Sequence, residues 1–405
     1  MITKRDLKAG IFLPPFHSND EDPQICFQRD FELIQRLDKL GFHEAWIGEH
    51  HSGGFEIYSS PELFIATAAE RTKQIKLGTG VISLPYHNPL IAAGRISQLD
   101  HQTRGRALFG FGPGMLVSDA MMLGINPDTQ RARMGEALDV IIRLLAGEVV
   151  TQKTEWFDLR EARLNLAPFT QPRPHFAVAS TATPNGARLA GKYGLGMLCI
   201  AAAAPAGYNA LDFNWRVANE MAAERGSSMD PRELRLMAPI HVAETHEQAV
   251  REINWGFEKF RQYMYSMRPE GPAAIGMPNE ISMENVGELN AEGKASIGTP
   301  DDAVALLERF WQKTGGFGTI LILAHDWAST EDTNKSFDMF ARYVLPKFAS
   351  RNTSRVDSLS WIRSHREEFT HASKSAMMKV VDKFMAEEAA KKKEPRGGRS
   401  PRGRA

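Results

Sequence analysis

Residues 75–84 read IKLGTGVISL, and residues 106–112 read RALFGFG. Both runs are short, mostly apolar along their length and bounded by polar residues, as are strands covered on both faces of a parallel sheet. Six other runs share this character, so we predict eight such strands. They cover residues 8–14, 44–50, 75–84, 106–112, 175–180, 196–201, 235–242 and 318–324.

The stretches between these runs predict helices. Residues 27–40 place apolar side chains at spacings of three and four, and the pattern stops at Gly41. Ser60 before Pro61 and Thr299 before Pro300 are typical of helix starts. Eight strands that alternate with helices favour an α/β fold of the (β/α)8 TIM-barrel type over a doubly wound sheet.

Two stretches exceed ordinary loop length, and we expect both to be insertions at the barrel mouth: residues 155–174 and 265–296. We predict a barrel domain over residues 1–350, a charged helical extension over 351–393 and a disordered basic tail over 394–405. A narrow apolar stripe runs along the extension. It consists of Met377, Val380, Val381, Phe384 and Met385.

The composition excludes several classes of protein. The 405 residues include 49 basic and 49 acidic ones, so no field over the whole chain argues for nucleic acid. Residues 391–405 carry seven basic residues and one acidic one, so this tail could touch an acidic surface or simply be solvated. Cys26 and Cys199 are too few for a disulfide framework. With no signal-peptide pattern and no run of about 18 apolar residues, we expect a cytoplasmic protein without a membrane partner.

Polar or glycine residues follow the predicted strands where a barrel places its working groups. The second, third and fourth strands end in EHHSGG (49–54), SLPYH (83–87) and GPGM (112–115). The fifth and eighth end in STAT (180–183) and HDW (325–327). This pattern predicts a lined pocket, with Glu49 and Trp327 on its substrate side.

Glu49, His50 and His51 invite a metal interpretation, which strand geometry weakens. Successive side chains of a strand alternate between faces, so the two histidines point apart, and no third ligand is evident beside Glu49 and His51. A proton-handling role for His50 is the preferred functional hypothesis, because an imidazole titrates near neutrality. The structural alternative is a histidine that hydrogen-bonds local backbone at a strand end.

Two further motifs suit a ligand. The run GFGPG (110–114) lacks the dinucleotide-binding spacing, so its glycines serve either close backbone packing or the approach of a flat ring. Ser180, Thr181 and Thr183 precede a predicted helix, and hydroxyls at a helix start suit a phosphate, although ordinary capping would need one of them.

Together these motifs resemble the bacterial luciferase-like flavin-dependent monooxygenases, in their limonene 1,2-monooxygenase-like branch. The similarity spans residues 8–348. It includes AWIGEHHSGG (45–54), LGTGVISLPYHNP (77–89), LDHQTRGR (99–106), FGFGPG (109–114), AVASTATPNGARLAGKYGLG (177–196) and HDWAS (325–329).

The resemblance implies a barrel that takes reduced flavin from a separate reductase, uses O2 as co-substrate and oxygenates a small apolar molecule, such as a terpene or cyclic ketone. FMN is expected in preference to FAD, and a homodimer is expected.

Individual positions match the family's functional residues. His50 matches its active-site histidine, and Gly80-Val81 match a non-prolyl cis peptide under the flavin ring. Gly112 and Met115 match positions beside the ring, whereas Ser180 and Thr181 match positions near the flavin phosphate and ring edge. Residues 265–296 overlap the family's mobile lid.

The sequence also departs from the family. Luciferase has a reactive cysteine at the position of Gly112 and a phosphate-contacting arginine at the position of Pro113, which argues against light emission. Two alternatives stay open. One is a flavin- or deazaflavin-dependent dehydrogenase of the same superfamily, and the other is a non-catalytic flavin-binding protein whose basic tail recruits it to a partner.

Overall fold

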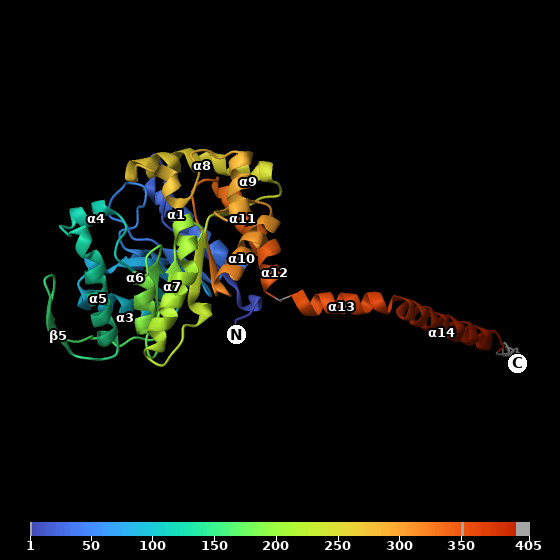
Figure 1. Cartoon of the computed structure of the whole chain (residues 1–405). Helices are drawn as coiled ribbons and strands as arrows, with labels where there is room; N and C mark the ends of the chain where they lie inside the picture. The colour runs from blue at the N-terminus through green and yellow to red at the C-terminus, as the bar shows by residue number, and fades with distance from the viewer. Residues whose placement is uncertain (1, 350–351, 394–405) are drawn as a thin grey trace, which may run out of the picture. The chain divides into compact units, whose positions relative to one another are not determined.

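A computed structural model describes residues 2–349 and 352–393 of the chain (Figure 1). It contains two compact units, Met1–Ala349 and Ser350–Ala405. Within the described residues, no helix is long and apolar enough to cross a membrane.

The first unit is a closed barrel of eight parallel strands, in the order β1-β12-β9-β8-β7-β4-β3-β2. Each strand arises from one of the eight predicted apolar runs, which confirms the TIM-barrel fold. The strands are β1 (Lys8–Leu13), β2 (Glu44–Ile47), β3 (Lys76–Ser83), β4 (Ala107–Gly112), β7 (His175–Ser180), β8 (Gly196–Cys199), β9 (Leu234–Ala238) and β12 (Thr319–Leu323).

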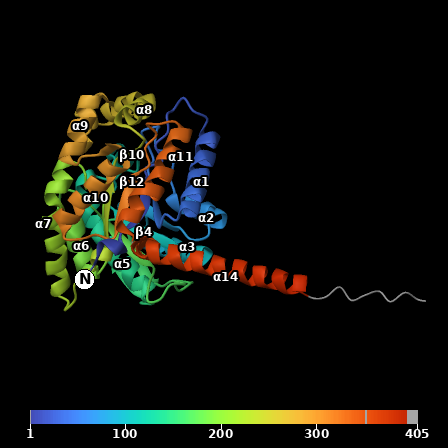
Figure 2. The same cartoon turned by 90° about the vertical axis from the view of Figure 1, so that its right-hand side faces the viewer.

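Helices cover the outside of the barrel (Figures 1 and 2). Many begin with proline, whose fixed φ suits the first helical position and whose missing N–H costs nothing there. α1 ends at Gly41, which has a φ of 80°. The surrounding helices are α1 (Pro23–Leu40), α2 (Pro61–Arg71), α3 (Pro89–Thr103), α5 (Gln130–Leu145), α6 (Asn185–Tyr193), α7 (Pro205–Ala223), α10 (Pro300–Thr314), α11 (Thr330–Met339) and α12 (Leu345–Phe348).

Trp46 fills the barrel interior, and glycines of the neighbouring strands make room for it. A Cβ on Gly78 would lie 2.6 Å from Cε3 of Trp46, and a Cβ on Gly110 would lie 3.0 Å from its Cζ3. The indole donates to Oε2 of Glu44, which also accepts from Nε of Arg235 at 2.7 Å. Both glycines therefore serve close packing, which for Gly110 is the structural one of the two interpretations of the run 110–114.

The run 235–242 forms two strands, where one was expected. Pro239 has no N–H to continue the ladder, and its carbonyl accepts from Ser296 N at 2.9 Å. The chain therefore leaves the barrel after β9. Its continuation, β10 (Ile240–Val242), pairs in parallel with β11 (Ser296–Gly298).

The insertion at 155–174 was expected at the mouth, and that expectation is wrong. β5 (Val150–Lys153) and β6 (Asp158–Ala162) form an antiparallel pair between α5 and β7. Thr170 donates from N and Oγ1 to Asp100, near the end of α3. Because a barrel helix returns the chain to the amino ends of the strands, an insertion before a strand lies at the opposite rim (Figure 1).

The second insertion does lie at the mouth. It contains the end of α8 (His246–Met267) and α9 (Met283–Glu292), which cover the carboxyl end of the barrel (Figures 1 and 2). α8 is seated closely, because a Cβ on its Gly256 would lie 2.2 Å from the carbonyl oxygen of Asp326. The covering element is thus longer than predicted and begins at residue 246.

The second unit is the predicted helical extension. It contains α13 (Thr353–Ser364) and α14 (Arg366–Lys393), and none of its described residues, 352–393, is buried. The predicted apolar stripe is exposed at all five positions, from Met377 to Met385. The predicted basic tail, 394–405, lies outside the described residues.

Candidate active site

His50 lies between two buried carboxylates, just beyond the end of β2. Its Nε2 is 3.0 Å from Oε2 of Glu56, and its Nδ1 is 3.4 Å from Oδ2 of Asp119. Burial by itself would lower the pKa of His50, but the charges and hydrogen bonds of the two carboxylates outweigh it and raise the pKa to about 10. His50 is therefore an imidazolium at neutral pH, with both N–H groups directed at acceptors.

Asp119 is fixed from several sides at the start of α4 (Val117–Met122). Its Oδ1 accepts from the backbone N of His51 at 3.1 Å and from the Ser52 hydroxyl. Burial would raise the pKa of Asp119, but His50 and Ser52 lower it below its ordinary value. Asp119 lies four residues after the quoted motif GPGM (112–115), and the sequence assigns it no role, because 69 residues separate it from His50.

Glu49 is occupied by three donors. Its Oε1 accepts from Nε2 of His51 at 3.1 Å and of His87 at 2.8 Å, and its Oε2 accepts from Ser83 N at 2.7 Å. Burial opposes ionisation, but these bonds lower the pKa of Glu49 to about 2. Glu49 therefore orients two histidines, His51 and His87, which come from the ends of two different predicted strands, and its role toward substrate stays a prediction.

Metal binding finds no support in this arrangement. Both imidazoles direct Nε2 at the same carboxylate oxygen, and Nδ1 of His87 accepts from Arg95 at 3.0 Å. Across residues 2–349 and 352–393, no group of three or more His, Cys, Asp or Glu side chains is arranged to hold a metal ion.

The ends of β3 and β4 present backbone and small side chains. The peptide bond between Gly80 and Val81 is cis, as the resemblance predicts. A Cβ on Gly112 would lie 2.5 Å from Cγ2 of Val81, so these two positions are in direct contact. Met115, just beyond, is 55% exposed. An apolar side chain is thus accessible three residues after Gly112.

Ser180 and Thr181 differ in accessibility. Ser180 is buried, whereas Thr181 and Thr183 are exposed. Asn214 on α7 donates from Nδ2 to the carbonyl of Thr181 at 2.8 Å, and its Oδ1 has no partner among the described residues. No described side chain caps the first N–H groups of α6. These N–H groups and the Thr181 hydroxyl suit an anion.

Trp327 anchors the covering helix. It is fully buried, stacks on His325 with ring centroids 4.1 Å apart, and contacts Phe257 and Phe260 of α8. Its Nε1 has no acceptor in the part of the chain that the structure describes. The structure places Trp327 under α8, and its place in the substrate pocket stays a prediction.

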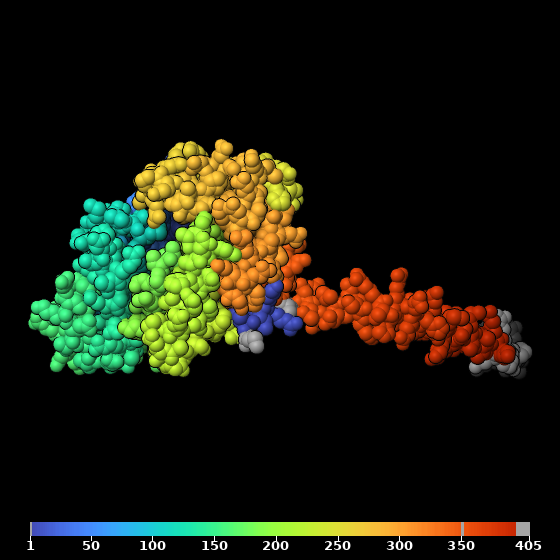
Figure 3. Space-filling view, viewed as in Figure 1, coloured from blue at the N-terminus to red at the C-terminus, as the bar shows by residue number. Residues whose placement is uncertain are grey.

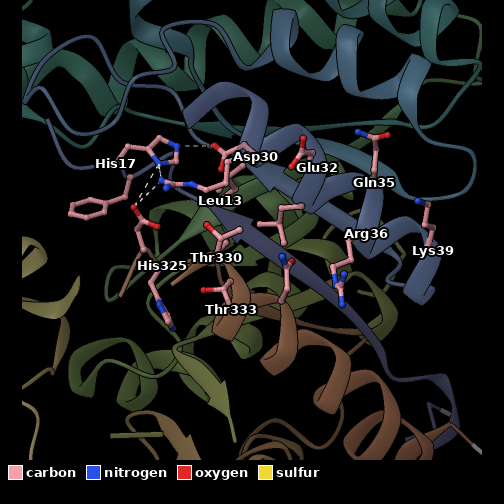
Figure 4. Close-up of a pocket in the computed structure, with 16 residues that line it drawn as sticks. Leu13, His17, Asp30, Glu32, Gln35, Arg36, Lys39, His325, Thr330 and Thr333 are labelled. Atoms are coloured by element: carbon pink, nitrogen blue, oxygen red, sulfur yellow. Dashed lines mark hydrogen bonds and ion pairs between the residues drawn. The ribbon is translucent and has the colours of Figure 1, made fainter. Parts of the chain in front are cut away.

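The mouth and a separate cavity are the two hollows of interest. Figure 3 shows the mouth hollowed between α4, the start of α7 and α8, with residues of the N-terminal part at its floor. A cavity of about 320 Å³ lies elsewhere, between α1 and α11. There His17 contacts Asp30 (Figure 4), and Arg29 donates to Asp326 at 3.0 Å.

Two residues of the site were missed altogether. Glu56 reaches His50 because the loop after β2 folds back and pairs with Phe16. Tyr263 comes from α8 and donates to Oε1 of Glu56 at 2.9 Å. No local sequence signal identifies either residue, because both contacts depend on segments that meet only in the folded barrel.

Comparison with known proteins identifies the family. Residues 7–317 match the family model described as luciferase-like monooxygenase. Limonene 1,2-monooxygenase of Rhodococcus erythropolis is 44% identical over 380 residues, which cover 94% of this chain and 96% of that protein. 4-Hydroxyprotoasukamycin monooxygenase of Streptomyces nodosus subsp. asukaensis is 41% identical over 359 residues, covering 88% and 96%.

A solved structure shares the fold. The oxygenating constituent of 3,6-diketocamphane monooxygenase from Pseudomonas putida, in complex with FMN, superimposes with a TM-score of 0.68 at 23% identity. The similarity covers 84% of this chain and 98% of that one. The family model and the two relatives above establish more than the fold: this chain belongs to the luciferase-like monooxygenase family.

Proposed function

We propose that this monooxygenase is the oxygenase component of a two-component system, which receives reduced flavin from a separate reductase and uses O2 to oxygenate a small apolar substrate. The proposal rests chiefly on His50, a buried imidazolium held between two carboxylates at the barrel mouth. Limonene or a related terpene is the proposed substrate class, supported by the 44% identity with limonene 1,2-monooxygenase.

The residues at the mouth fit a flavin mononucleotide. The Gly80-Val81 backbone and the exposed Met115 offer a surface for a flat ring. Thr181 and the uncapped N–H groups of α6 offer donors for a phosphate, and Oδ1 of Asn214 is a buried acceptor left without a described partner. Reduced flavin, when bound, supplies the electrons that activate O2. We propose FMN rather than FAD because these donors suit a single phosphate.

The chain's own residues then have distinct tasks. His50 is charged before substrate arrives, and in the reaction one of its two N–H groups turns from its carboxylate to the reacting oxygen, where it donates a hydrogen bond or a proton. Glu56 and Asp119 hold that proton and fix the ring. α8 excludes water, since Phe257 and Phe260 pack with Trp327 over the mouth.

A coupling measurement tests the role of His50. The purified chain is supplied with FMN, a flavin reductase, NADH, O2 and limonene, and oxygenated product and hydrogen peroxide are both quantified. We expect H50Q to lower product formation by about 10²–10⁴-fold, the usual range for a proton donor, while peroxide release rises. In the wild type, the ratio of product to peroxide, which we call the coupling of the reaction, should stay constant from pH 6 to 9. It should fall as pH approaches about 10, because His50 then loses its proton.

A matched control accompanies this variant. His101 is exposed and donates from Nε2 to the carbonyl of Ala167, near the opposite rim, so H101Q should leave coupling unchanged. Normal coupling in H50Q would refute the role of His50. A wild type that turns over deazaflavin, and forms no oxygenated product with reduced FMN and any terpene offered, would refute the proposed function.

A further inference from the structure

The Glu56 side chain contacts residues from two different parts of the barrel mouth. The Glu56 side chain is 8% exposed, with Oε2 3.0 Å from Nε2 of His50 and Oε1 accepting the hydroxyl of Tyr263 at 2.9 Å. Glu56 comes from the loop after β2, whereas Tyr263 comes from α8, the helix that covers the mouth. One carboxylate therefore contacts both the candidate catalytic histidine and its cover.

The contacts from His50 through Glu56 to Tyr263 form a bridge between the loop after β2 and α8. Hydrogen bonds and ring packing hold both ends of this bridge in place. The loop is tied to the segment after β1, because His17 N donates to the carbonyl of Phe55 at 2.8 Å. The Tyr263 ring packs with Phe16 and Phe55, with centroids 5.2 Å and 4.8 Å apart. Burial and the charge of Glu56 raise the pKa of Tyr263, so its hydroxyl stays protonated and acts as a donor. The bridge thus has one defined hydrogen-bonding pattern.

We propose that Glu56 is a positioning residue that couples the proton on His50 to the closure of α8 over the mouth, with Tyr263 as the contact on the helix. The inference rests on the proposed function only in assigning His50 to the reaction. The coupling itself is a property of the folded chain.

The coupling is reciprocal by thermodynamic linkage. While α8 is closed, the Tyr263 hydroxyl satisfies Glu56 and water is kept from the pair, so the attraction between Glu56 and His50 is strong. When α8 opens, water solvates Glu56 and His50 holds its proton less tightly. The other charged or titratable groups around His50 are Asp119 on α4 and the neighbouring His51. Neither of these two contacts α8 through the bridge.

Two isosteric variants separate the two halves of the bridge. E56Q removes the charge that faces His50, and Y263F removes only the hydroxyl while keeping the ring against Phe16 and Phe55. The pKa of His50 is measured by NMR with 13C-labelled histidine, assigned by the signal missing from H50Q. Closure of α8 is measured by hydrogen exchange of residues 257–267. Both measurements use the full chain without cofactor.

We expect E56Q to lower the pKa of His50 by about 1–3 units, the usual effect of losing an adjacent opposite charge. Y263F should lower it by a smaller amount and speed exchange in α8 roughly fivefold, as expected for one lost hydrogen bond. In the double variant, exchange should be no faster than in the faster single variant, because both changes act on the same contact: E56Q weakens it by removing the charge, and Y263F removes its donor.

Tyr265 provides the matched control on the same helix. It is 43% exposed and donates to Oδ1 of Asn279, so Y265F should leave the pKa of His50 unchanged. If Y263F changes the His50 pKa no more than Y265F does, the coupling is overturned. Additive exchange effects in the double variant overturn it as well. If E56Q does not fold, Y263F against Y265F decides alone.

These readouts also distinguish the two proposals. If Y263F changes both the pKa of His50 and hydrogen exchange in α8, but the wild type forms no product, the oxygenase proposal is contradicted. The link between His50 and α8 would then still stand. Product formation that is normal in Y263F, with no change in the His50 pKa, would retain the oxygenase and remove Glu56 from its positioning role.

Discussion

At the scale of single residues, neighbouring carboxylates decide which imidazole carries charge. His50 has two carboxylates within 3.4 Å, and its pKa rises to about 10. His325 is buried without such a partner among the described residues, and desolvation holds its pKa well below the ordinary value. The two side chains are chemically identical, so their opposite states come entirely from what the fold places beside them.

The contact between Gly112 and Val81 gives a prediction at this scale. In G112A the new Cβ would lie 2.5 Å from Cγ2 of Val81 and must displace it. Because Val81 follows the peptide bond at which we place the flavin ring, we expect FMN to bind about tenfold or more weakly. The loss of folding stability should be modest, about 1–3 kcal/mol for overpacking. Flavin fluorescence titration and urea unfolding measure the two effects.

A second glycine serves as the control. Apart from its chain neighbours and the adjacent backbone of α3, no described atom lies within 4 Å of a Cβ placed on Gly94, which lies inside that helix. G94A should bind FMN normally and gain about 0.4–1 kcal/mol, because alanine loses less conformational entropy in a helix. Equal FMN affinity in both variants would remove Gly112 and Val81 from the flavin site.

At the scale of elements, one buried carboxylate fixes the connection between α2 and β3. Asp38 lies near the end of α1, and its side chain accepts three backbone N–H groups, from Lys73, Gln74 and Ile75, at 2.7–2.9 Å. Burial opposes its ionisation, but these bonds hold the pKa of Asp38 below its ordinary value. The carboxylate thus sets where β3 begins, and with it the position of Gly80 and Val81 at the other end.

We expect D38N to lower the free energy of unfolding by about 1.5–3 kcal/mol at pH 7, because an amide replaces a charged acceptor. The pKa is lower in the folded state, so this contribution is present above the ordinary carboxyl pKa and is lost as pH falls below it. Urea unfolding at pH 7 and at pH 3, which lies below the ordinary value of 3.8, should therefore give a smaller difference at pH 3. A difference that grows on acidification would contradict this account.

At the scale of the whole molecule, an ion pair ties strands together across the barrel interior. Glu44 on β2 accepts from Arg235 on β9 at 2.7 Å and from Thr319 on β12 at 2.9 Å. These strands are far apart in the sequence but meet around Trp46, whose indole shares the same carboxylate. The barrel is therefore closed by contacts inside the first unit.

The second unit gives the prediction at this scale. None of its described residues, 352–393, is buried. Removing residues 350–405 should therefore change the melting temperature of the barrel by no more than about 2 °C, which corresponds to a change in the free energy of unfolding of under roughly 1 kcal/mol. Calorimetry measures it, and a chain lacking only 394–405 is the control. If the melting temperature falls by more than about 5 °C when residues 350–405 are removed, but not when only 394–405 are removed, the extension stabilises the barrel. That result would contradict the predicted domain boundaries.

The fold was readable from the sequence because its signal is local. Strands buried on both faces must be apolar along their length, and each predicted run forms a strand. The errors arose where topology decides position: Pro239 splits one run, and the segment at 155–174 lies at the rim opposite the mouth. The sequence also predicts a role for His50 from its place at a strand end, whereas the two carboxylates beside His50 come only from the structure.

The sequence by itself determined a parallel barrel, its family and the strand end that carries His50, because periodicity and contiguous motifs are written in neighbouring residues. Only the tertiary structure decided that Glu56, Asp119 and Tyr263 surround that histidine. Their contacts join residues up to 207 positions apart, and barrel closure creates the burial that makes the charges strong.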